Sequence, residues 1–283
     1  LEAAFATAHR ELVNIAFRSK AAREYEGIEL SPGYEKHTHD LERLAARYPG
    51  QVFPFLAVDQ RRKGILELIK LKVAEGKGVF KGIKLYPPMG YLPTHPKLRP
   101  ILEYCAEHDI PIITHASPGG IQNSCTKLFV SDSSGKDRWE NFVVYRGNKR
   151  AFFADPLRWQ PILEDMPTLR INFAHAGGSD QLLDEKMEII RGLPPWLAKI
   201  IGFMNSYPNV YADLSHYTER LALEKMLEYV DRHPIMNSRL MFGTDFVMIL
   251  MDKKLGKTER YFDNFSMFNE KILSANARDF IKI

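Results

Sequence analysis

Residues 169–175 read LRINFAH, a short apolar run that ends on a histidine. Five further runs end in the same way: residues 53–58 lead into Asp59, 82–83 into Lys84, 111–114 into His115, 210–212 into Asp213 and 240–244 into Asp245. Between consecutive runs lies at least one stretch with helical periodicity, which is typical of parallel strands joined by crossover helices. In a (β/α) barrel the carboxyl ends of the strands meet at one mouth, where catalytic groups collect. The sequence therefore predicts an α/β protein with these polar residues around one pocket.

The composition is that of an ordinary globular protein. The chain has 283 residues, 45% apolar and 26% charged, a length that suits a single α/β barrel domain. A net charge of +4 without a long basic run argues against nucleic-acid binding, and no apolar run reaches the roughly 20 residues of a membrane span. The two cysteines, Cys105 and Cys125, form no disulfide framework. We expect a cytoplasmic protein with a small-molecule substrate, without nucleic-acid or membrane partners, that can form a homo-oligomer.

The order of predicted elements is regular from residue 52 onward. Strands are expected at 52–58, 80–85, 112–114, 169–174, 210–212 and 240–242, and helices at 61–74, 96–108, 155–166, 181–203 with an interruption at Pro194-Pro195, 218–232 and from 257 to the end. Residues 1–50 are predicted to be a helical segment, with helices over 1–20 and 34–48. Six strands are two fewer than an eight-stranded barrel needs. The expectation is a single domain over residues 1–283, a TIM (β/α)8-type barrel whose strands 1 and 2 are missing at the N-terminus.

Residues 116–154 form an unusually long connection between two predicted strands. The segment is rich in Ser, Gly and Asn and contains Trp139, Tyr145 and Arg146. Loops of this length inside a compact domain are commonly functional. On a barrel the segment would leave from the mouth, so we predict a lid or pocket wall whose Trp139, Tyr145 and Arg146 contact substrate.

His115, His175 and Asp245 are the strongest candidates for chemistry. Imidazole nitrogen and carboxylate oxygen are the usual ligands of a catalytic zinc, which keeps one position open for water. Such a metal lowers the pKa of the bound water to roughly 7, and a carboxylate beside it can take the proton and return it to a leaving group. The alternative is that each histidine caps its strand by a hydrogen bond to a neighbouring loop.

Five segments carry a more specific signal. They read FKGIKLYPP (80–88), IPIITH (110–115), NFAHAGG (172–178), NVYAD (209–213) and FGTDF (242–246). Together they resemble the amidohydrolase superfamily, in particular the amidohydrolase-2 branch of metal-dependent hydrolases and decarboxylases, over most of residues 40–280. The resemblance implies that His115 binds a metal, that His175 binds a second metal or assists catalysis beside a single one, and that Asp245 binds metal and transfers the proton.

The resemblance also implies a divalent metal, with zinc the first choice and one ion favoured over two. Some relatives carry a carboxylated lysine that bridges two metals on the fourth strand, which Lys84 occupies here. The alternatives for Lys84 are a structural ion pair and a contact with a substrate carboxylate. His216 is a second candidate for substrate binding, and both His216 and Asp213 are candidates for anchoring the loops behind the site.

One family feature has no convincing counterpart. The superfamily begins with a His-x-His pair at the end of strand one, and the only such spelling here is His37-Thr38-His39. This segment is predicted to be helical, and side chains two residues apart on a helix point in different directions. We therefore predict that both are solvated helix residues far from His115, and that the true pair lies upstream of Leu1.

Three functional hypotheses remain from the sequence. The leading one is a metal-dependent hydrolase that uses metal-activated water on a C–N or C–O bond of a small, cyclic or carboxylated substrate, with Asp245 and His175 as catalytic residues. The first alternative keeps the fold and the metal but performs non-oxidative decarboxylation. The second is a degenerate barrel that binds a ligand without catalysis.

Overall fold

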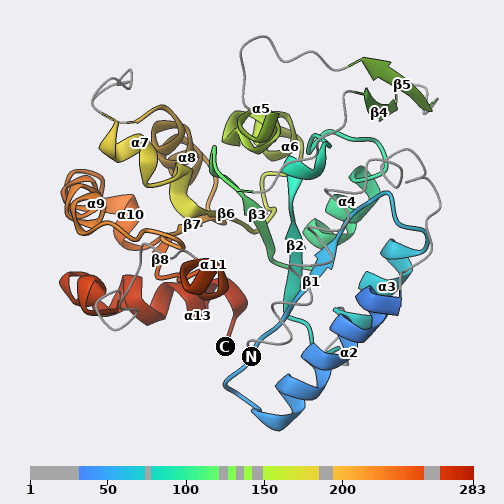
Figure 1. Ribbon diagram of the computed structural model, residues 1–283, viewed down its shortest axis with the longest axis horizontal. Coiled ribbons are helices and arrows are strands. Elements are labelled where there is room, and N and C mark those ends of the chain that lie inside the picture. Colours follow the sequence, from blue (N-terminus) through green and yellow to red (C-terminus); the bar gives the residue numbers. More distant parts are fainter. Residues whose placement is uncertain are drawn as a thin grey trace. The chain divides into compact units, whose positions relative to one another are not determined.

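The structure is a computed structural model that describes residues 32–73, 78–120, 127–131, 137–141, 149–184, 194–251 and 262–283 (Figure 1). Its contacts divide the chain into two compact units. One unit contains Leu1–Ile113 and Gly119–Ala154, and the other contains Thr114–Pro118 and Asp155–Ile283. The boundary falls within strand β3 (Ile112–His115). The helix predicted over residues 1–20 lies outside the described residues, and the expectation of a single domain stays a prediction.

Alternating strands and helices build the first unit, as predicted. Strand β1 (Phe55–Val58) pairs in parallel with β2 (Gly82–Leu85), and β3 follows β2 in the sheet order. Helix α3 (Ile65–Lys72) connects β1 to β2, and η2 (Pro87–Met89) and α4 (Arg99–Glu107) connect β2 to β3. A helix between parallel neighbours is the βαβ unit that the spacing of apolar runs indicates.

The second unit continues the same pattern. Strands β6 (Ile171–Ala174), β7 (Val210–Asp213) and β8 (Leu240–Met241) pair in parallel, and the end of β3 stands beside β6. In the described residues of this unit, the helices before, between and after these strands are η3 (Pro156–Trp159), α6 (Gln160–Asp165), η4 (His175–Gly177), α7 (Asp180–Leu183), α8 (Pro195–Ser206), α9 (Arg220–Arg232), α10 (Pro234–Asn237), α11 (Phe246–Met251), η5 (Phe265–Met267), η6 (Lys271–Ala275) and α13 (Asn276–Ile281). All six predicted strands are therefore present, each starting at or after its predicted first residue.

Burial explains why β6 and β7 form where they do. Every residue of both strands is buried, as expected of parallel strands covered on both faces. On β6, the ring of Phe173 lies 5.9 Å from Phe203 in a stacked arrangement and 6.3 Å from Trp159 edge to face. These aromatic contacts fix the core of the second unit directly behind the strand ends that carry the candidate residues.

Part of the long connection over residues 116–154 is regular structure, which corrects the expectation of a loop. Strands β4 (Lys127–Ser131) and β5 (Asp137–Asn141) form an antiparallel pair, and helix α5 (Lys149–Ala154) ends the segment. Trp139 lies on β5, whereas Tyr145 and Arg146 lie outside the described residues. The lid function and the three substrate contacts stay predictions.

Helix α2 (Pro32–Arg47) replaces the helix predicted over 34–48, and one prediction about it is wrong. His39 is solvated as expected, with 68% of its side chain exposed. His37 is not: it is only 7% exposed because it lies on the buried face with Tyr34, Leu41 and Ala45. These positions recur every three to four residues, the spacing of one helix face, so a histidine at 37 shares that face.

Two smaller findings concern the remaining expectations. Cys105 is a buried free thiol, and burial raises its pKa far above the ordinary range, so it stays protonated. Within the described residues, no helix has both the length and the apolar character that a membrane crossing requires.

Candidate active site

Two histidines from different strands meet in the second unit. His115 ends β3, and His175 follows the last residue of β6. The backbone joins the two strand ends, since Ala116 N–H donates to the Ala174 carbonyl at 3.1 Å. The imidazoles then face each other edge on, with 3.0 Å between His115 Nδ1 and His175 Nε2. The sequence placed both at strand ends, and the structure brings them together.

The backbone after β6 has an unusual conformation. His175, Ala176, Gly177 and Gly178 have φ values of 71°, 42°, 91° and 93°, all in the left-handed region. At Gly178 a side chain would also collide with Ser117, whose Oγ lies 2.9 Å from the position of a Cβ. A left-handed residue other than glycine costs about 1–2 kcal/mol, so other contacts must hold His175 in place.

Asp213 supplies one of those contacts from the end of β7. Its carboxylate is buried and accepts hydrogen bonds from His175 N–H at 3.1 Å, from Ser215 N–H at 2.9 Å and from the Asn172 amide at 2.6 Å. The Ser215 hydroxyl donates to the same carboxylate. Asp213 therefore anchors both the strained backbone of His175 and the loop after β7, in line with the anchoring role considered from the sequence.

Ser215 connects this carboxylate to the imidazole. His175 Nδ1 lies 3.0 Å from the Ser215 carbonyl oxygen and 2.9 Å from Ser215 Oγ. Tyr217 covers the network from the same loop: its buried hydroxyl contacts the Ala176 carbonyl at 3.5 Å, and burial raises its pKa so that it remains a donor. Nδ1 of His175 is therefore in contact with Ser215, and Nε2 faces His115.

Asp245 and His216 lie on the loops after β8 and β7. Both residues are half-buried with positive φ, 53° and 63°, and His216 N–H donates to the Thr244 carbonyl at 3.0 Å, which ties the two loops together. The backbone carbonyl of Asp245 accepts from Met248 N–H at 2.8 Å and so begins α11. No residue in the described part of the chain forms a hydrogen bond or ion pair with its carboxylate.

The three predicted metal ligands are not brought together as a set. Over the described ranges, no group of three or more His, Cys, Asp or Glu side chains could hold a metal ion. The two imidazoles alone do fit a shared ion: ligand nitrogens about 2.0–2.1 Å from a tetrahedral zinc stand about 3.3 Å apart, close to the 3.0 Å observed. The metal roles of His115, His175 and Asp245 stay predictions.

The first unit places the other strand-end residues. Lys84 is half-buried on β2 opposite Ala57, and its three predicted roles (a bridging carboxylated lysine, a structural ion pair or a substrate contact) stay predictions. Asp59 follows β1 and binds Arg61 through two hydrogen bonds, Nε to Oδ1 at 2.8 Å and Nη2 to Oδ2 at 2.6 Å. Burial alone would raise the pKa of Asp59, but the Arg61 guanidinium holds that pKa below its ordinary value. Asp59 is a structural ion-pair member.

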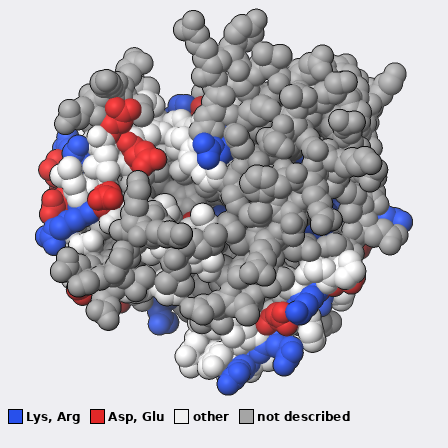
Figure 2. Space-filling view, in the orientation of Figure 1, with Lys and Arg blue, Asp and Glu red and all other residues white. Residues whose placement is uncertain are grey.

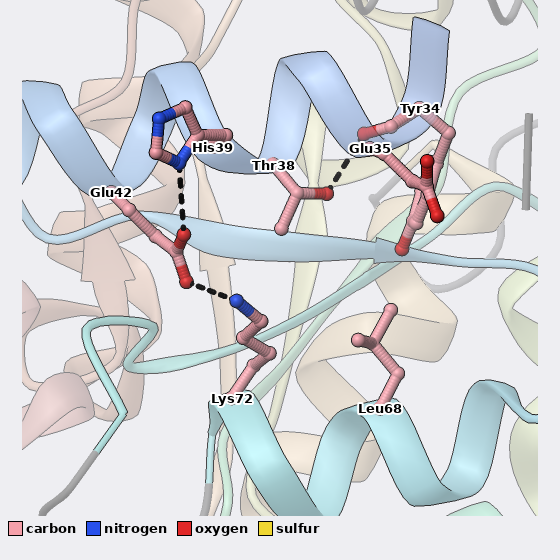
Figure 3. A pocket seen from close by; sticks show the side chains of 7 residues that line it. All are labelled: Tyr34, Glu35, Thr38, His39, Glu42, Leu68 and Lys72. Atoms are coloured by element: carbon pink, nitrogen blue, oxygen red, sulfur yellow. Dashed lines mark hydrogen bonds and ion pairs between the residues drawn. The ribbon is translucent and has the colours of Figure 1, made fainter. Parts of the chain in front are cut away.

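A shallow pocket between α2 and α3 is lined in part by His39. Figure 3 shows His39 turned toward Glu42, with 3.7 Å between Nδ1 and Oε2, and Lys72 Nζ reaching the other oxygen of Glu42 at 2.6 Å. Figure 2 shows basic and acidic side chains side by side on this part of the surface. His39 therefore belongs to a surface charge network rather than to a ligand set.

Sequence reasoning missed Asn172 and Ser215. The signal for Asn172 was a polar residue inside a strand whose neighbours are all apolar, since such a residue needs a buried partner. The signal for Ser215 was its spacing from Asp213, because a carboxylate readily accepts from the backbone N–H two residues later. Neither signal shows that Asn172 and Ser215 both bind Asp213, or that Ser215 also contacts the imidazole of His175.

The fold and this constellation define an α/β protein of the TIM-barrel class, with an imidazole pair at its strand ends. A sequence model of the family described as Amidohydrolase matches residues 14–283, so the chain belongs to that family. No curated protein matches.

Solved structures agree on the fold. An uncharacterized TIM-barrel protein from Bordetella bronchiseptica is 18% identical with a TM-score of 0.56, covering 87% of this chain and 72% of that one. A probable 2-pyrone-4,6-dicarboxylic acid hydrolase from Acinetobacter baumannii is 13% identical with a TM-score of 0.54, covering 87% and 79%. A 5-carboxyvanillate decarboxylase from Novosphingobium aromaticivorans, complexed with manganese, is 17% identical with a TM-score of 0.51, covering 88% and 70%.

Proposed function

We propose that this protein is a metal-dependent hydrolase that cleaves a C–N or C–O bond of a small carboxylated substrate. The observation that carries the proposal is the convergence of His115 Nδ1 and His175 Nε2 at 3.0 Å at the ends of neighbouring strands. Membership of the amidohydrolase family and the hydrolase among the similar structures support it. The manganese in the similar decarboxylase supports a divalent ion, and zinc remains our first choice.

A bound divalent ion would supply Lewis acidity, polarising a substrate carbonyl and easing the loss of a proton from water. His115 and His175 would hold it through the two facing nitrogens. The Asp245 carboxylate, which no described side chain engages, would take up the proton of the attacking water and give it to the leaving nitrogen or oxygen. His216 and Lys84 are the proposed contacts for the substrate carboxylate.

Non-oxidative decarboxylation is the second candidate, favoured by the decarboxylase among the similar structures. In that reaction the bond between a ring carbon and its carboxylate breaks, carbon dioxide leaves, and the ring carbon takes a proton. Protonated Asp245 would be the donor. The two reactions would use the same residues and differ in the direction of proton transfer at Asp245. Only the product therefore distinguishes them.

The experiment compares two substrate panels on protein first stripped of metal and then given zinc or manganese. Lactones and amides with a carboxylate report hydrolysis, and hydroxylated aromatic carboxylates report carbon dioxide release. We expect metal-dependent turnover of the first panel. Turnover confined to the second panel establishes the decarboxylase, whereas metal binding without turnover of either panel establishes the ligand-binding alternative and overturns catalysis.

Asp245→Asn tests the proton transfer. Because the amide keeps the shape but cannot accept the proton, kcat should fall by about 10²–10⁴-fold. Asp231→Asn is the matched control, since it makes the same change on the exposed face of α9 and should leave turnover unchanged. Undiminished turnover in Asp245→Asn would refute this role.

A further inference from the structure

The hydrogen-bond network behind His175 determines where the proton of its imidazole lies. Ser215 presents two oxygen atoms to the same ring nitrogen: its carbonyl oxygen lies 3.0 Å and its Oγ 2.9 Å from His175 Nδ1. A carbonyl oxygen can only accept a hydrogen bond. The short distance is therefore favourable only if Nδ1 carries the proton.

The direction of the next hydrogen bond agrees with this assignment. Ser215 has one hydroxyl proton, and that proton is donated to the Asp213 carboxylate, which can only accept. With its proton engaged there, Ser215 Oγ offers a lone pair to Nδ1–H. The opposite assignment would place the Nδ1 lone pair against the Ser215 carbonyl oxygen and the Oγ lone pair against a carboxylate oxygen, two repulsive contacts.

Asp213 is itself held so that it cannot turn away from Ser215. One oxygen accepts from the Asn172 amide at 2.6 Å, and the other accepts from the backbone N–H groups of His175 and Ser215. Both oxygens are therefore oriented by groups on β6 and on the loop after β7. Gly243 packs against this arrangement, since a Cβ there would lie 3.1 Å from Ser215 Cβ.

From this geometry we propose that Ser215, oriented by Asp213, is a positioning residue that fixes His175 as the Nδ1–H tautomer. The consequence lies at the other ring nitrogen: Nε2 keeps its lone pair and presents it toward His115 Nδ1, 3.0 Å away. A ligand imidazole whose remote N–H is held by an oxygen has a fixed ring orientation and is a better donor to a cation. The catalytic meaning rests on the proposed function, but the tautomer does not.

The direct test is long-range ¹H–¹⁵N NMR of the imidazole rings in the metal-free wild-type protein. His175→Gln identifies the signals of His175 by their disappearance. We expect Nδ1 to show the shift of a proton-bearing nitrogen and Nε2 the shift of an unprotonated nitrogen. A proton on Nε2 overturns the proposal, and this readout needs neither substrate nor a Ser215 variant.

Ser215 is then tested by substitution. In Ser215→Ala the Nδ1–H form should lose part of its preference, and the dissociation constant for zinc should rise about 10-fold, the lower end for such a partner. Ser215→Thr, which keeps the hydroxyl, should restore both values. Ser238→Ala is the matched control, because the hydroxyl of Ser238 donates to the Ile235 carbonyl at the surface of the same unit. An unchanged tautomer and zinc affinity in Ser215→Ala would overturn the role of the hydroxyl.

The outcomes separate this inference from the proposed function. If His175 is found as the Nδ1–H tautomer but the protein turns over no substrate, the role of Ser215 is upheld and the proposed hydrolase function is refuted. Turnover by a protein whose His175 is protonated on Nε2 does the reverse. Where activity is found, Ser215→Ala should lower kcat with little change in KM, because Ser215 does not contact substrate.

Discussion

Two strand ends in this protein carry an aspartate, buried at Asp213 and 14% exposed at Asp59, and the surroundings of the two differ. At the end of β1, Asp59 is bound by two hydrogen bonds from one arginine, Arg61, which is itself buried. At the end of β7, Asp213 accepts from neutral donors, and one of them, Ser215, continues to an imidazole. The first arrangement satisfies only its own charges. In the second arrangement, Asp213 orients Ser215, and Ser215 in turn orients the imidazole of His175. An aspartate at the end of a strand therefore contributes to stability in one unit and to the candidate site in the other.

Asp59→Asn should produce the largest change in stability. Removal of one partner leaves the buried Arg61 guanidinium uncompensated, which costs about 3–5 kcal/mol. Urea unfolding measures the change, and Glu103→Gln is the matched control because its pair with Arg99 is about half exposed. The control should change stability by less than about 1 kcal/mol. Equal effects of the two variants would show that the Asp59 pair is not structural.

Asp213→Asn should have the next largest effect, of another kind. An amide must turn its NH₂ either toward the Asn172 amide or toward the N–H groups of His175 and Ser215, so donors face each other whichever way it lies. We expect a loss of about 1–3 kcal/mol in stability from the unsatisfied groups. Zinc affinity or turnover should also fall, by about 10–100-fold. A variant that loses stability but binds zinc normally would place Asp213 in the same structural class as Asp59.

The pH dependence of stability sharpens the contrast at β1. The pKa of Asp59 is lower in the folded protein than in the unfolded chain because Arg61 stabilises the carboxylate. A group of this kind contributes its full stability above the unfolded pKa, about 3.9, and loses it as the pH falls through the folded pKa. The difference in unfolding free energy between wild type and Asp59→Asn should therefore shrink as the pH is lowered from about 5. A constant difference would contradict the ion pair.

The smallest effect is expected on helix α2, where burial rather than residue type separates two histidines. His39→Gln should change stability by no more than about 0.5 kcal/mol, because the side chain is mostly exposed. His37→Gln, on the buried face, should cost about 1 kcal/mol. Thermal unfolding of the two variants side by side provides the comparison, and equal midpoints would show that the buried face tolerates the change.

The strands were predictable because burial on both faces leaves an apolar run that few other structures produce. The meeting of His115 and His175 followed from the same pattern, since strand ends on one edge converge. The contribution of Ser215 was not predictable, because it depends on the register that sets Phe173 opposite Ala212 and so brings Asn172 within reach of Asp213. The burial of His37 could have been predicted from the sequence, because its spacing places it on the same helix face as Tyr34, Leu41 and Ala45.

Left-handed backbone at three predicted site residues has a consequence for protein engineering. His175, His216 and Asp245 all have positive φ. Glycine at any of them would remove about 1–2 kcal/mol of strain, against about 0.5–1 kcal/mol for its greater freedom in the unfolded chain. Directed evolution for heat resistance alone would therefore collect glycines in place of His216 and Asp245, whereas at His175 the loss of the contacts with Ser215 opposes the gain. The most heat-resistant descendants would be those that had discarded an imidazole or the carboxylate.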